Sequence, residues 1–310
     1  MTDLLTIGET MVSLRTARPM RLGGDAHLSI AGSESNVAIG LARLGHQAAW
    51  VGAVGDDEPG RLIQRTLRAE GVDTRWVRFS EESFTGFIAF DQPSHDITRV
   101  SYHRRGSAGS TLTSEECVAA LQAATPRLLH VTGITPALSD SARIATLDVV
   151  RAAAESGVLV SLDVNYRARL WSRAEAVVLR ELVPHVHTVF ASDDELDILS
   201  DGAEPVRDLL DNGIAEVVVT AGGKGAWSHT ADGTLHRPAL PVTVVDSIGA
   251  GDAFVSGYLS ATLDGLSPDQ RLDRATTSGA FCVTATGDWE SLPTREDLTL
   301  RTHPRGTALR

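Results

Sequence analysis

Nearly continuous apolar segments alternate with helical patterns along most of this 310-residue chain. Residues 48–55 (AAWVGAVG) and 216–222 (EVVVTAG) are apolar or small over most of their length, which is typical of strands buried on both faces. Residues 35–45 and 141–157 place apolar side chains at helical spacing, and both segments end at a glycine that suits a helix C-terminus. We therefore predict an α/β fold in which a mostly parallel sheet carries helices on both faces.

Two stretches, residues 11–31 and 84–105, interrupt this alternation because neither contains a convincing helical pattern. Within the second stretch, residues 84–91 and 98–104 alternate in character around a turn-like QPSHD segment. We predict antiparallel strands that form a small extra sheet at one edge of a single domain, residues 1–310. Such a sheet could cover a ligand site as a lid, or it could be a structural hairpin only.

The charge balance, 28 Lys and Arg against 40 Asp and Glu, gives a formal net charge of −12. A negative surface repels nucleic acid and anionic membranes, so we expect neither as a partner. Residues 1–14 lack the pattern of a signal peptide, and no apolar run reaches the ~18 residues of a membrane span. Cys117 and Cys282 lie far apart and outside any metal-binding spacing, which predicts reduced, buried thiols. These features favour a cytoplasmic protein.

The turn Gly249-Ala250-Gly251-Asp252 is the most informative chemical motif. It follows an apolar segment, residues 242–245, which predicts a strand, and it precedes an amphipathic helix. Glycines at a strand-to-helix turn let the backbone approach a ligand, and the free N–H groups at the helix start can bind an anion. Asp252 could take a proton from an attacking hydroxyl during phosphoryl transfer, or it could only cap the helix.

Competing phosphate-loop and catalytic motifs are absent from the sequence. Residues 222–225 (GGKG) contain a lysine but no G-x-x-x-x-G-K-[ST] run. The early glycines do not form G-x-G-x-x-G after the first predicted strand, and neither H-E-x-x-H nor G-x-S-x-G occurs. The sequence therefore does not support a P-loop, a dinucleotide-binding site, a zinc protease site or a nucleophile elbow.

Residues 246–254 (DSIGAGDAF) resemble the D-T-x-G-A-G-D signature that ribokinase-like (PfkB) sugar kinases carry late in the chain. Residues 31–45 (AGSESNVAIGLARLG) are similar to the N-terminal signature of that family. The resemblance implies a three-layer α/β/α sandwich with a small β-sheet lid, and an ATP-dependent kinase that uses Mg²⁺. It leaves a monovalent-cation requirement open. It also implies that Asp252 is the general base, beside an anion hole formed by the backbone of Gly249, Ala250 and Gly251.

Further matches to the family imply a nucleotide site. Residues 217–226 (VVVTAGGKGA) resemble its nucleotide-binding strand and loop, unless they form only a hairpin turn. The magnesium-associated N-x-x-E motif stands here with serine first, at residues 192–195, and Glu195 would hold Mg²⁺ through water or only face solvent. Thr276 falls where relatives place a residue near the adenine. The implied ATP-binding residues are Ser192, Thr220, Gly222, Lys224, Gly225 and Thr276.

Three segments resemble the 2-keto-3-deoxygluconate kinase branch of the family: residues 101–109 (SYHRRGSAG), 130–139 (HVTGITPALS) and 162–171 (LDVNYRARLW). A sugar acid carries a carboxylate, which arginine binds through a planar, two-pronged fork. Arg167 could instead form a structural ion pair. The implied substrate-binding residues are Gly32, Asn36, Tyr102, Arg104, Arg167 and Asp288.

Two positions depart from that branch, because His103 and Ile88 stand where relatives often carry tyrosine. The matches still imply ATP-dependent phosphorylation of 2-keto-3-deoxygluconate at its C6 hydroxyl, with the lid excluding water. A fructokinase, or a kinase of another ketose or sugar acid, is the alternative within the family. A sugar-sensing protein without turnover is the alternative of another class, although sensing alone would not need Asp252. Lid strands in this family often pair between subunits, which implies a homo-oligomer.

Overall fold

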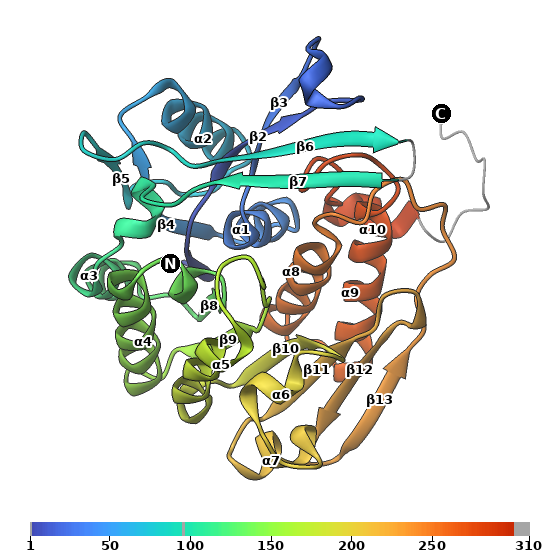
Figure 1. The fold of residues 1–310 in the computed structure, drawn as a ribbon. Coiled ribbons are helices and arrows are strands. Elements are labelled where there is room, and N and C mark those ends of the chain that lie inside the picture. Colours follow the sequence, from blue (N-terminus) through green and yellow to red (C-terminus); the bar gives the residue numbers. More distant parts are fainter. Residues whose placement is uncertain (1, 95–96, 301–310) are drawn as a thin grey trace.

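The computed structural model describes residues 2–94 and 97–300, and its framework is a nine-stranded sheet (Figure 1). The strand order is β13-β12-β11-β10-β9-β8-β1-β4-β5. Neighbouring strands from β11 to β5 pair in parallel, whereas β12 and β13 add an antiparallel edge. The strands of this sheet are β1 Leu4–Ile7, β4 Ala48–Gly55, β5 Val77–Ser80, β8 Leu128–Thr132, β9 Leu159–Asp163, β10 Thr188–Ser192, β11 Glu216–Thr220, β12 Ala226–Thr230 and β13 Gly233–Arg237. The predicted mostly parallel α/β fold is confirmed.

Several helices begin and end where local sequence signals favour it. The Ser139 side chain accepts a hydrogen bond from Ala142 N–H and so caps α4, and Gly45 follows α1 with a positive φ of 87°. The α-helices are α1 Ser33–Arg43, α2 Glu58–Ala69, α3 Ser114–Ala124, α4 Asp140–Glu155, α5 Arg173–Ala176, α6 Leu196–Leu199, α7 Pro205–Asp211, α8 Ala250–Leu263, α9 Pro268–Cys282 and α10 Arg295–Leu300. The 3₁₀ helices are η1 Met20–Leu22, η2 Ala108–Thr111, η3 Thr135–Ala137, η4 Val177–His185 and η5 Gly222–Lys224.

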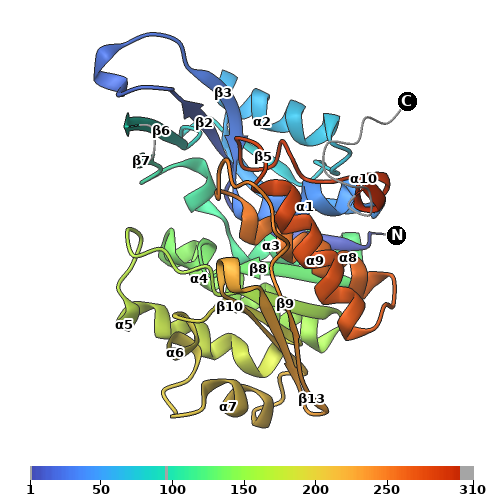
Figure 2. The same ribbon diagram turned by 90° about the vertical axis from the view of Figure 1, so that its right-hand side faces the viewer.

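Residues of the central strands enter two separate cores, one on each face of the large sheet. In β4, Val51 and Ala53 pack into the core that holds α3 and α4, whereas Trp50 and Val54 pack into the core that holds α1, α2, α8 and α9. Figure 2 shows the resulting layers, with the sheet between two groups of helices. Burial on both faces explains why these strands are continuously apolar in sequence, and the predicted three-layer sandwich is confirmed.

Strands β2 Met11–Arg15, β3 His27–Ala31, β6 Phe87–Ser94 and β7 Ile97–His103 form a second, small sheet in the order β3-β2-β6-β7 (Figure 1). The pairs β2–β3 and β6–β7 are antiparallel, but the central pair β2–β6 is parallel. The expectation of purely antiparallel strands is therefore wrong at the centre. The reason is that β2 follows β1 and β6 follows β5, so both strands leave the carboxyl ends of parallel strands and run in one direction. The single-domain organisation stays a prediction.

The strand predicted over residues 242–245 is absent, and this expectation is wrong. Val244 and Val245 are 63% and 58% exposed, and the chain from Pro238 to Ser247 contains no strand. The backbone N–H of Val245 donates instead to the carbonyl of Val283, just after α9. This stretch therefore leaves the edge of the large sheet as a loop and reaches the start of α8 across the end of α9.

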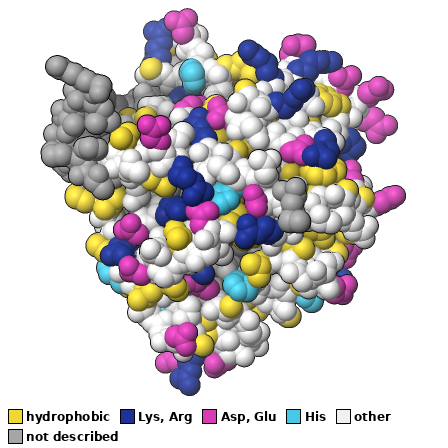
Figure 3. All heavy atoms as spheres, turned by 180° about the vertical axis from the view of Figure 1, so that it is seen from behind, with side chains coloured by type: hydrophobic (Ala, Val, Ile, Leu, Met, Phe, Trp, Pro, Cys, Tyr) yellow, Lys and Arg dark blue, Asp and Glu magenta, His cyan; other side chains and the backbone are white. Residues whose placement is uncertain are grey.

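The structure shows the charge on one face of the surface and the state of both cysteines, which are buried as predicted. On the face in Figure 3, acidic and basic side chains lie intermingled with hydrophobic ones. Within residues 2–94 and 97–300, no helix is both long and apolar enough to cross a bilayer. Cys117 and Cys282 are free and buried, and burial raises the pKa of each thiol to about 12.

Candidate active site

A cavity of about 400 Å³ lies between the small sheet and the carboxyl ends of β9, β10 and β11. Met11, Ile88 and Phe90 of the small sheet supply an apolar wall, and polar residues supply the opposite wall. Ligands of open α/β sheets commonly bind outside the carboxyl ends of the strands. Most of the predicted site residues line this cavity: Gly32, Asn36, Tyr102, Arg104, Arg167, Ser192, Glu195, Thr220, Gly249, Gly251, Asp252 and Asp288.

Asp252 lies buried in the first turn of α8, and α1 holds its carboxylate. Ser33 Oγ donates to Asp252 Oδ1 at 2.6 Å, and Asn36 Nδ2 donates to Oδ2 at 2.7 Å. Burial raises the pKa of Asp252, although these two hydrogen bonds oppose the rise. The side chain does not cap α8, whose N-cap residue is Gly249. Its oxygens are thus available for chemistry in the cavity rather than for helix capping.

The turn before Asp252 has the geometry of an anion site. Gly249 has a φ of 76°, and a Cβ there would lie 2.0 Å from the carbonyl oxygen of Asp288, so only glycine fits. The N–H of Ala250 donates to Ser247 O at 3.4 Å. In the described part of the chain, the N–H groups of Gly251 and Asp252 have no partner, and a Cβ on Gly251 would meet open space. Two free N–H groups at a helix start can bind an anion, and Ala250 contributes less than expected.

Asn165 and Asp163, which the sequence analysis did not single out, connect to the base through Ser33. Asn165 Nδ2 donates to Ser33 Oγ at 2.9 Å and to Asp163 Oδ2 at 3.1 Å. Asn165 has a φ of 42°, a left-handed conformation that asparagine tolerates better than most residues. Burial, together with the negative charges of Glu195 and Asp252, holds the pKa of Asp163 well above its usual value. The motif at residues 162–171 contains both residues and was the available signal.

Arg104 is buried and forms an ion pair with Glu9, a third residue that the sequence analysis did not single out. The Nε and Nη2 atoms of Arg104 lie 2.6 and 2.5 Å from Glu9 Oε2, and Ser107 Oγ donates a hydrogen bond to Glu9 Oε1. Glu9 stands just after β1 and Arg104 just after β7, so the pair connects the large sheet to the small one. Arg104 therefore retains only Nη1 for a ligand in the cavity.

Arg167 is exposed at the mouth of the cavity and forms no ion pair with any described residue. Its Nη1 donates to the carbonyl of Tyr166 at 3.2 Å, and its charge acts to lower the pKa of both Asp163 and Asp252. The alternative of a structural ion pair for Arg167 has no support within residues 2–94 and 97–300.

The two departures from the sugar-acid branch lie on opposite faces of the small sheet. Ile88 is 5% exposed and lines the cavity beside Tyr102. His103 stacks on Phe87, with ring centroids 4.3 Å apart, and does not line the cavity. Ile88 is therefore the departure that changes the wall of the site.

Asp288 closes one end of the cavity and is buried. Burial raises its pKa to about 7, although the positive charge of Arg15 opposes the rise. Arg15 Nη2 lies 3.5 Å from Asp288 Oδ1, and Arg15 Nη1 lies 3.0 Å from Asp246 Oδ2. The arginine thus holds two acids from the loop before α8 and the loop after α9.

The predicted nucleotide residues are only partly brought together. Ser192, Glu195 and Thr220 line the cavity, whereas Gly222 and Lys224 of η5 and Gly225 directly after it do not. Thr276 is buried in α9, and its hydroxyl donates to the carbonyl of Leu272. None of these four residues lines the cavity.

Glu195 accepts two backbone hydrogen bonds, from Tyr166 N–H at 2.6 Å and from Ser192 N–H at 2.8 Å. Across residues 2–94 and 97–300, no group of three or more His, Cys, Asp or Glu side chains forms a metal cage. Mg²⁺ usually takes one or two carboxylates and completes its shell with water and phosphate oxygens. A cavity-lining carboxylate with free lone pairs fits that mode of binding, and Glu195 meets this condition.

The family model described as pfkB family carbohydrate kinase matches residues 1–295. A 2-dehydro-3-deoxygluconokinase of Bacillus subtilis (strain 168) is 36% identical, over 96% of this chain and 94% of that protein. A fructokinase of Klebsiella pneumoniae is 33% identical, over 86% of this chain and 90% of that protein. The crystal structure of a fructokinase double mutant from Vibrio cholerae O395, with fructose, ADP and potassium ion bound, is similar at a TM-score of 0.83 and 27% identity, covering 97% of this chain and 98% of that one.

Proposed function

Because this chain belongs to the pfkB family of carbohydrate kinases, which use ATP, we propose that it phosphorylates the C6 hydroxyl of 2-keto-3-deoxygluconate. The observation that carries the proposal is the meeting of Asp252 and Arg167 in one cavity. A buried carboxylate supports removal of a proton from a hydroxyl, and a guanidinium without an acidic partner among the described residues supports binding of a sugar acid. 2-Dehydro-3-deoxygluconate is another name for 2-keto-3-deoxygluconate. The similarity to the B. subtilis 2-dehydro-3-deoxygluconokinase therefore supports this choice of substrate.

In the proposed reaction, Asp252 accepts the proton of the sugar hydroxyl while that oxygen bonds to the γ-phosphorus of ATP. The bond between the γ-phosphorus and the β–γ bridging oxygen breaks, and ADP leaves with that oxygen. Ser33 and Asn36 hold the two carboxylate oxygens in place throughout. The N–H groups of Gly251 and Asp252 stabilise charge on the transferred phosphoryl group. Burial raises the pKa of Asp252 toward the working pH, which makes the carboxylate a stronger base.

The sugar acid would be held by charge at one end and by hydroxyl contacts along its length. Arg167 binds the carboxylate, with Arg104 Nη1 as a second donor. The side-chain carbonyl oxygens of Asn36 and Asn165 are buried without a partner among the described residues, so they can accept hydrogen bonds from sugar hydroxyls. Tyr102 offers a hydroxyl from the small sheet.

Glu195 is the residue that would hold Mg²⁺, through water and the phosphate oxygens, without an all-protein cage. When bound, the ion would neutralise part of the negative charge of the phosphate groups and so favour phosphoryl transfer. A monovalent cation stays open for this chain, although the V. cholerae fructokinase structure contains potassium. The homo-oligomer and the cytoplasmic location stay predictions.

A fructokinase is the second candidate, and two observations favour it. Fructokinases are among the relatives at 33% identity, and Arg104 is already engaged by Glu9. The deciding experiment is an ADP-release assay in which the purified protein is given 2-keto-3-deoxygluconate, 2-keto-3-deoxygalactonate, fructose or ribose as the acceptor. The proposal requires a kcat/KM for the sugar acids above that for both neutral sugars. A preference for fructose would overturn it.

The role of Asp252, which a sensor would not need, is tested by Asp252→Asn. Asparagine keeps one acceptor oxygen, for either Ser33 or Asn36, but cannot take up the proton. We expect kcat to fall by about 10²–10⁴ with sugar-acid binding retained, the usual contribution of a positioned base. Calorimetry with sugar acid and no nucleotide supplies the binding control. Turnover like that of the wild type in this variant would mean that Asp252 is not the base. No ADP release from the wild-type protein with any sugar would favour the sensor.

A further inference from the structure

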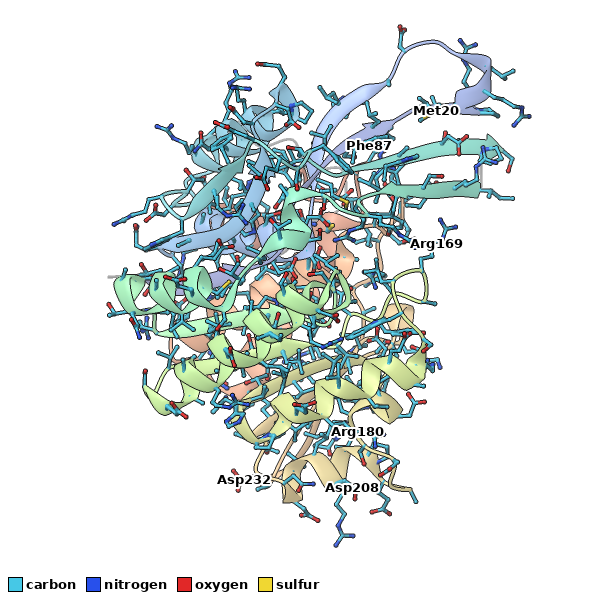
Figure 4. All side chains as sticks on the ribbon, turned by 60° about the vertical axis from the view of Figure 1, so that its left-hand side comes forward. Met20, Phe87, Arg169, Arg180, Asp208 and Asp232 are labelled. Carbon is cyan, nitrogen blue, oxygen red and sulfur yellow. The ribbon has the colours of Figure 1, made fainter. Side chains whose placement is uncertain are left out.

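A second, larger opening adjoins the active-site cavity on the side of the small sheet. It has a volume of about 1130 Å³ and shares Val100, Tyr102, Arg104 and Arg167 with the inner cavity. We call this opening the outer cleft. Its remaining lining comes from the ends of β6 and η3, from β7 and the residues that follow it, and from the loop after β9. Figure 4 shows Arg169 between the outer part of β7 and the latter loop.

The charge of the outer cleft is opposite to that of the molecule. Five arginines line it, Arg99, Arg104, Arg105, Arg167 and Arg169, and none of its described lining residues is an Asp or Glu. Two of the five are neutralised from outside the cleft, Arg99 by Asp91 and Arg104 by Glu9. The other three, Arg105, Arg167 and Arg169, are exposed and form no ion pair with a described residue. On a chain with a net charge of −12, this is a local positive field.

The inner cavity has the reverse balance. Six carboxylates line it, from Glu9, Glu34, Asp163, Glu195, Asp252 and Asp288, against the two arginines Arg104 and Arg167. The acids that stay ionised repel an anionic sugar, and so does the net charge of the molecule. Capture of an anion therefore needs an attractive field before the substrate enters the cavity. The outer cleft is the opening in which such a field exists.

Arg169 also fixes the shape of the outer cleft. Its Nη1 donates to the carbonyl of Val100 in β7 at 2.6 Å, so the loop after β9 is joined to the small sheet. The charge on Arg169 is held over the opening by this contact. Arg105 is the second residue after β7 and lines the same opening.

We propose that the outer cleft is an electrostatic entry site for the anionic sugar acid, in which Arg105 and Arg169 attract the carboxylate and pass it to Arg167. This inference rests on the proposed function, because it requires an anionic substrate. It assigns Arg105 and Arg169 to capture only, since neither lines the inner cavity where the phosphoryl group is transferred.

The test is the ionic-strength dependence of KM in the double variant Arg105→Gln/Arg169→Gln. Glutamine keeps a side-chain donor for Val100 but removes both charges. At an ionic strength of about 0.01 M, where charges act over ~30 Å, we expect the KM for the sugar acid to rise about three- to tenfold. At about 0.5 M the variant and the wild type should converge, because charges on the surface are then screened within a few Å.

Three controls separate charge from other effects. Arg105→Lys/Arg169→Lys keeps both charges and should behave as the wild type. Arg65→Gln/Arg68→Gln makes the same change in net charge on α2, away from the cleft, and should leave the KM unchanged. The KM values for ATP and for a neutral sugar should stay within about twofold in every variant, because neither depends on this entry.

Equal KM values for the double variant and the wild type at low salt would overturn the inference. A rise that persists at high salt would also overturn it, since that would indicate a direct contact or a distorted loop. An equal rise in the KM for ATP would also contradict it, since the overall charge of the molecule, rather than the outer cleft, would then cause the effect. If the wild type phosphorylates only neutral sugars, the proposed function fails first and this inference fails with it; if the sugar acid is a substrate but the salt effect is missing, only this inference fails.

Discussion

Asp252 combines burial with hydrogen bonds that act on its pKa in opposite directions. Desolvation raises the pKa of the carboxyl group, whereas the donors Ser33 and Asn36 stabilise its charged form. Ser33 is itself oriented, because Asn165 Nδ2 donates to its oxygen and leaves the hydroxyl hydrogen for Asp252. At the scale of single residues, Ser33 is therefore a positioning residue that holds the proposed base and favours its ionised form.

Ser33→Ala should raise the pKa of Asp252, because the donor to Oδ1 is lost. The acidic limb of the kcat–pH profile should move to higher pH, and kcat should fall about tenfold at pH 6 and less at pH 8, as expected for one lost hydrogen bond to a charged group. Ser35→Ala is the matched control, since Ser35 Oγ donates to the Gly32 carbonyl in the same turn of α1. A uniform loss at all pH values would show that Ser33 has only a structural role.

Arg167→Lys should separate sugar acids from neutral sugars. Lysine keeps the charge but cannot reproduce the two-pronged contact with a carboxylate. A lost charged hydrogen bond of about 1.5–3 kcal/mol predicts a roughly tenfold to two-hundredfold fall in kcat/KM for the sugar acid. Side activity on fructose should change little, because fructose has no carboxylate. Equal losses on the two substrates, measured in the same assay, would assign Arg167 a structural role.

At the scale of elements, the start of α8 joins a strained turn to a free helix terminus. Gly249 takes the positive φ that the turn requires, and Gly251 presents bare backbone to open space. The helix behind them packs closely on α1 and α9 through the shared core. The two N–H groups that have no partner among the described residues, those of Gly251 and Asp252, thus stand on a helix that is packed against two neighbours.

Gly251→Val should block this position, because a branched side chain would fill the space that the phosphoryl group needs. We expect kcat to fall by about 10²-fold or more, the loss typical of removing an oxyanion donor, with sugar-acid affinity nearly unchanged. Gly251→Ala, which adds a single methyl group to the same open space, should lose less. Calorimetry with sugar acid alone provides the readout, and a loss of affinity as large as the loss of rate would place the phosphate site elsewhere.

At the scale of the whole molecule, the active site is a concentration of buried acids and therefore affects stability. Asp288 has a folded pKa of about 7 against an ordinary value of 3.8. Between these values the folded protein binds a proton that the unfolded chain has released, so the free energy of unfolding falls as pH rises through this window. Above pH 7 the full cost of the buried charge remains.

Asp288→Asn removes this dependence. The melting temperature of the variant relative to the wild type should therefore increase from pH 5 to pH 8. His130, whose pKa burial lowers to about 3, makes stability rise with pH up to its ordinary value of 6.5, but this effect is common to both proteins and cancels in the difference. Differential scanning calorimetry at the two pH values supplies the measurement. A difference that is constant with pH would mean that Asp288 is ionised in the folded protein throughout.

The order of strands and helices and the turn at Gly249 could be predicted from the sequence because both are local signals. Continuous apolar segments such as residues 48–55 require burial on both faces, and a glycine at a positive φ is a property of one turn. The apolar segment at residues 242–245 shows the limit of such reasoning. Apolar character predicts a strand only where a neighbouring strand is available, and here the backbone bonds to the end of α9 instead.

The partners of the site residues were decided by the tertiary structure. Ser33 meets Asp252 across 219 residues, Asn165 meets Ser33 across 132, and Glu9 meets Arg104 across 95. No local pattern specifies these pairs, because each depends on how strands and helices that are distant in sequence pack against one another. From the sequence, Asp252 and Arg167 could be named as candidates for a base and for carboxylate binding, because each belongs to a local motif. The packing of α1, α8 and the small sheet decided that Ser33 and Asn36 bond to Asp252 and that Glu9 pairs with Arg104.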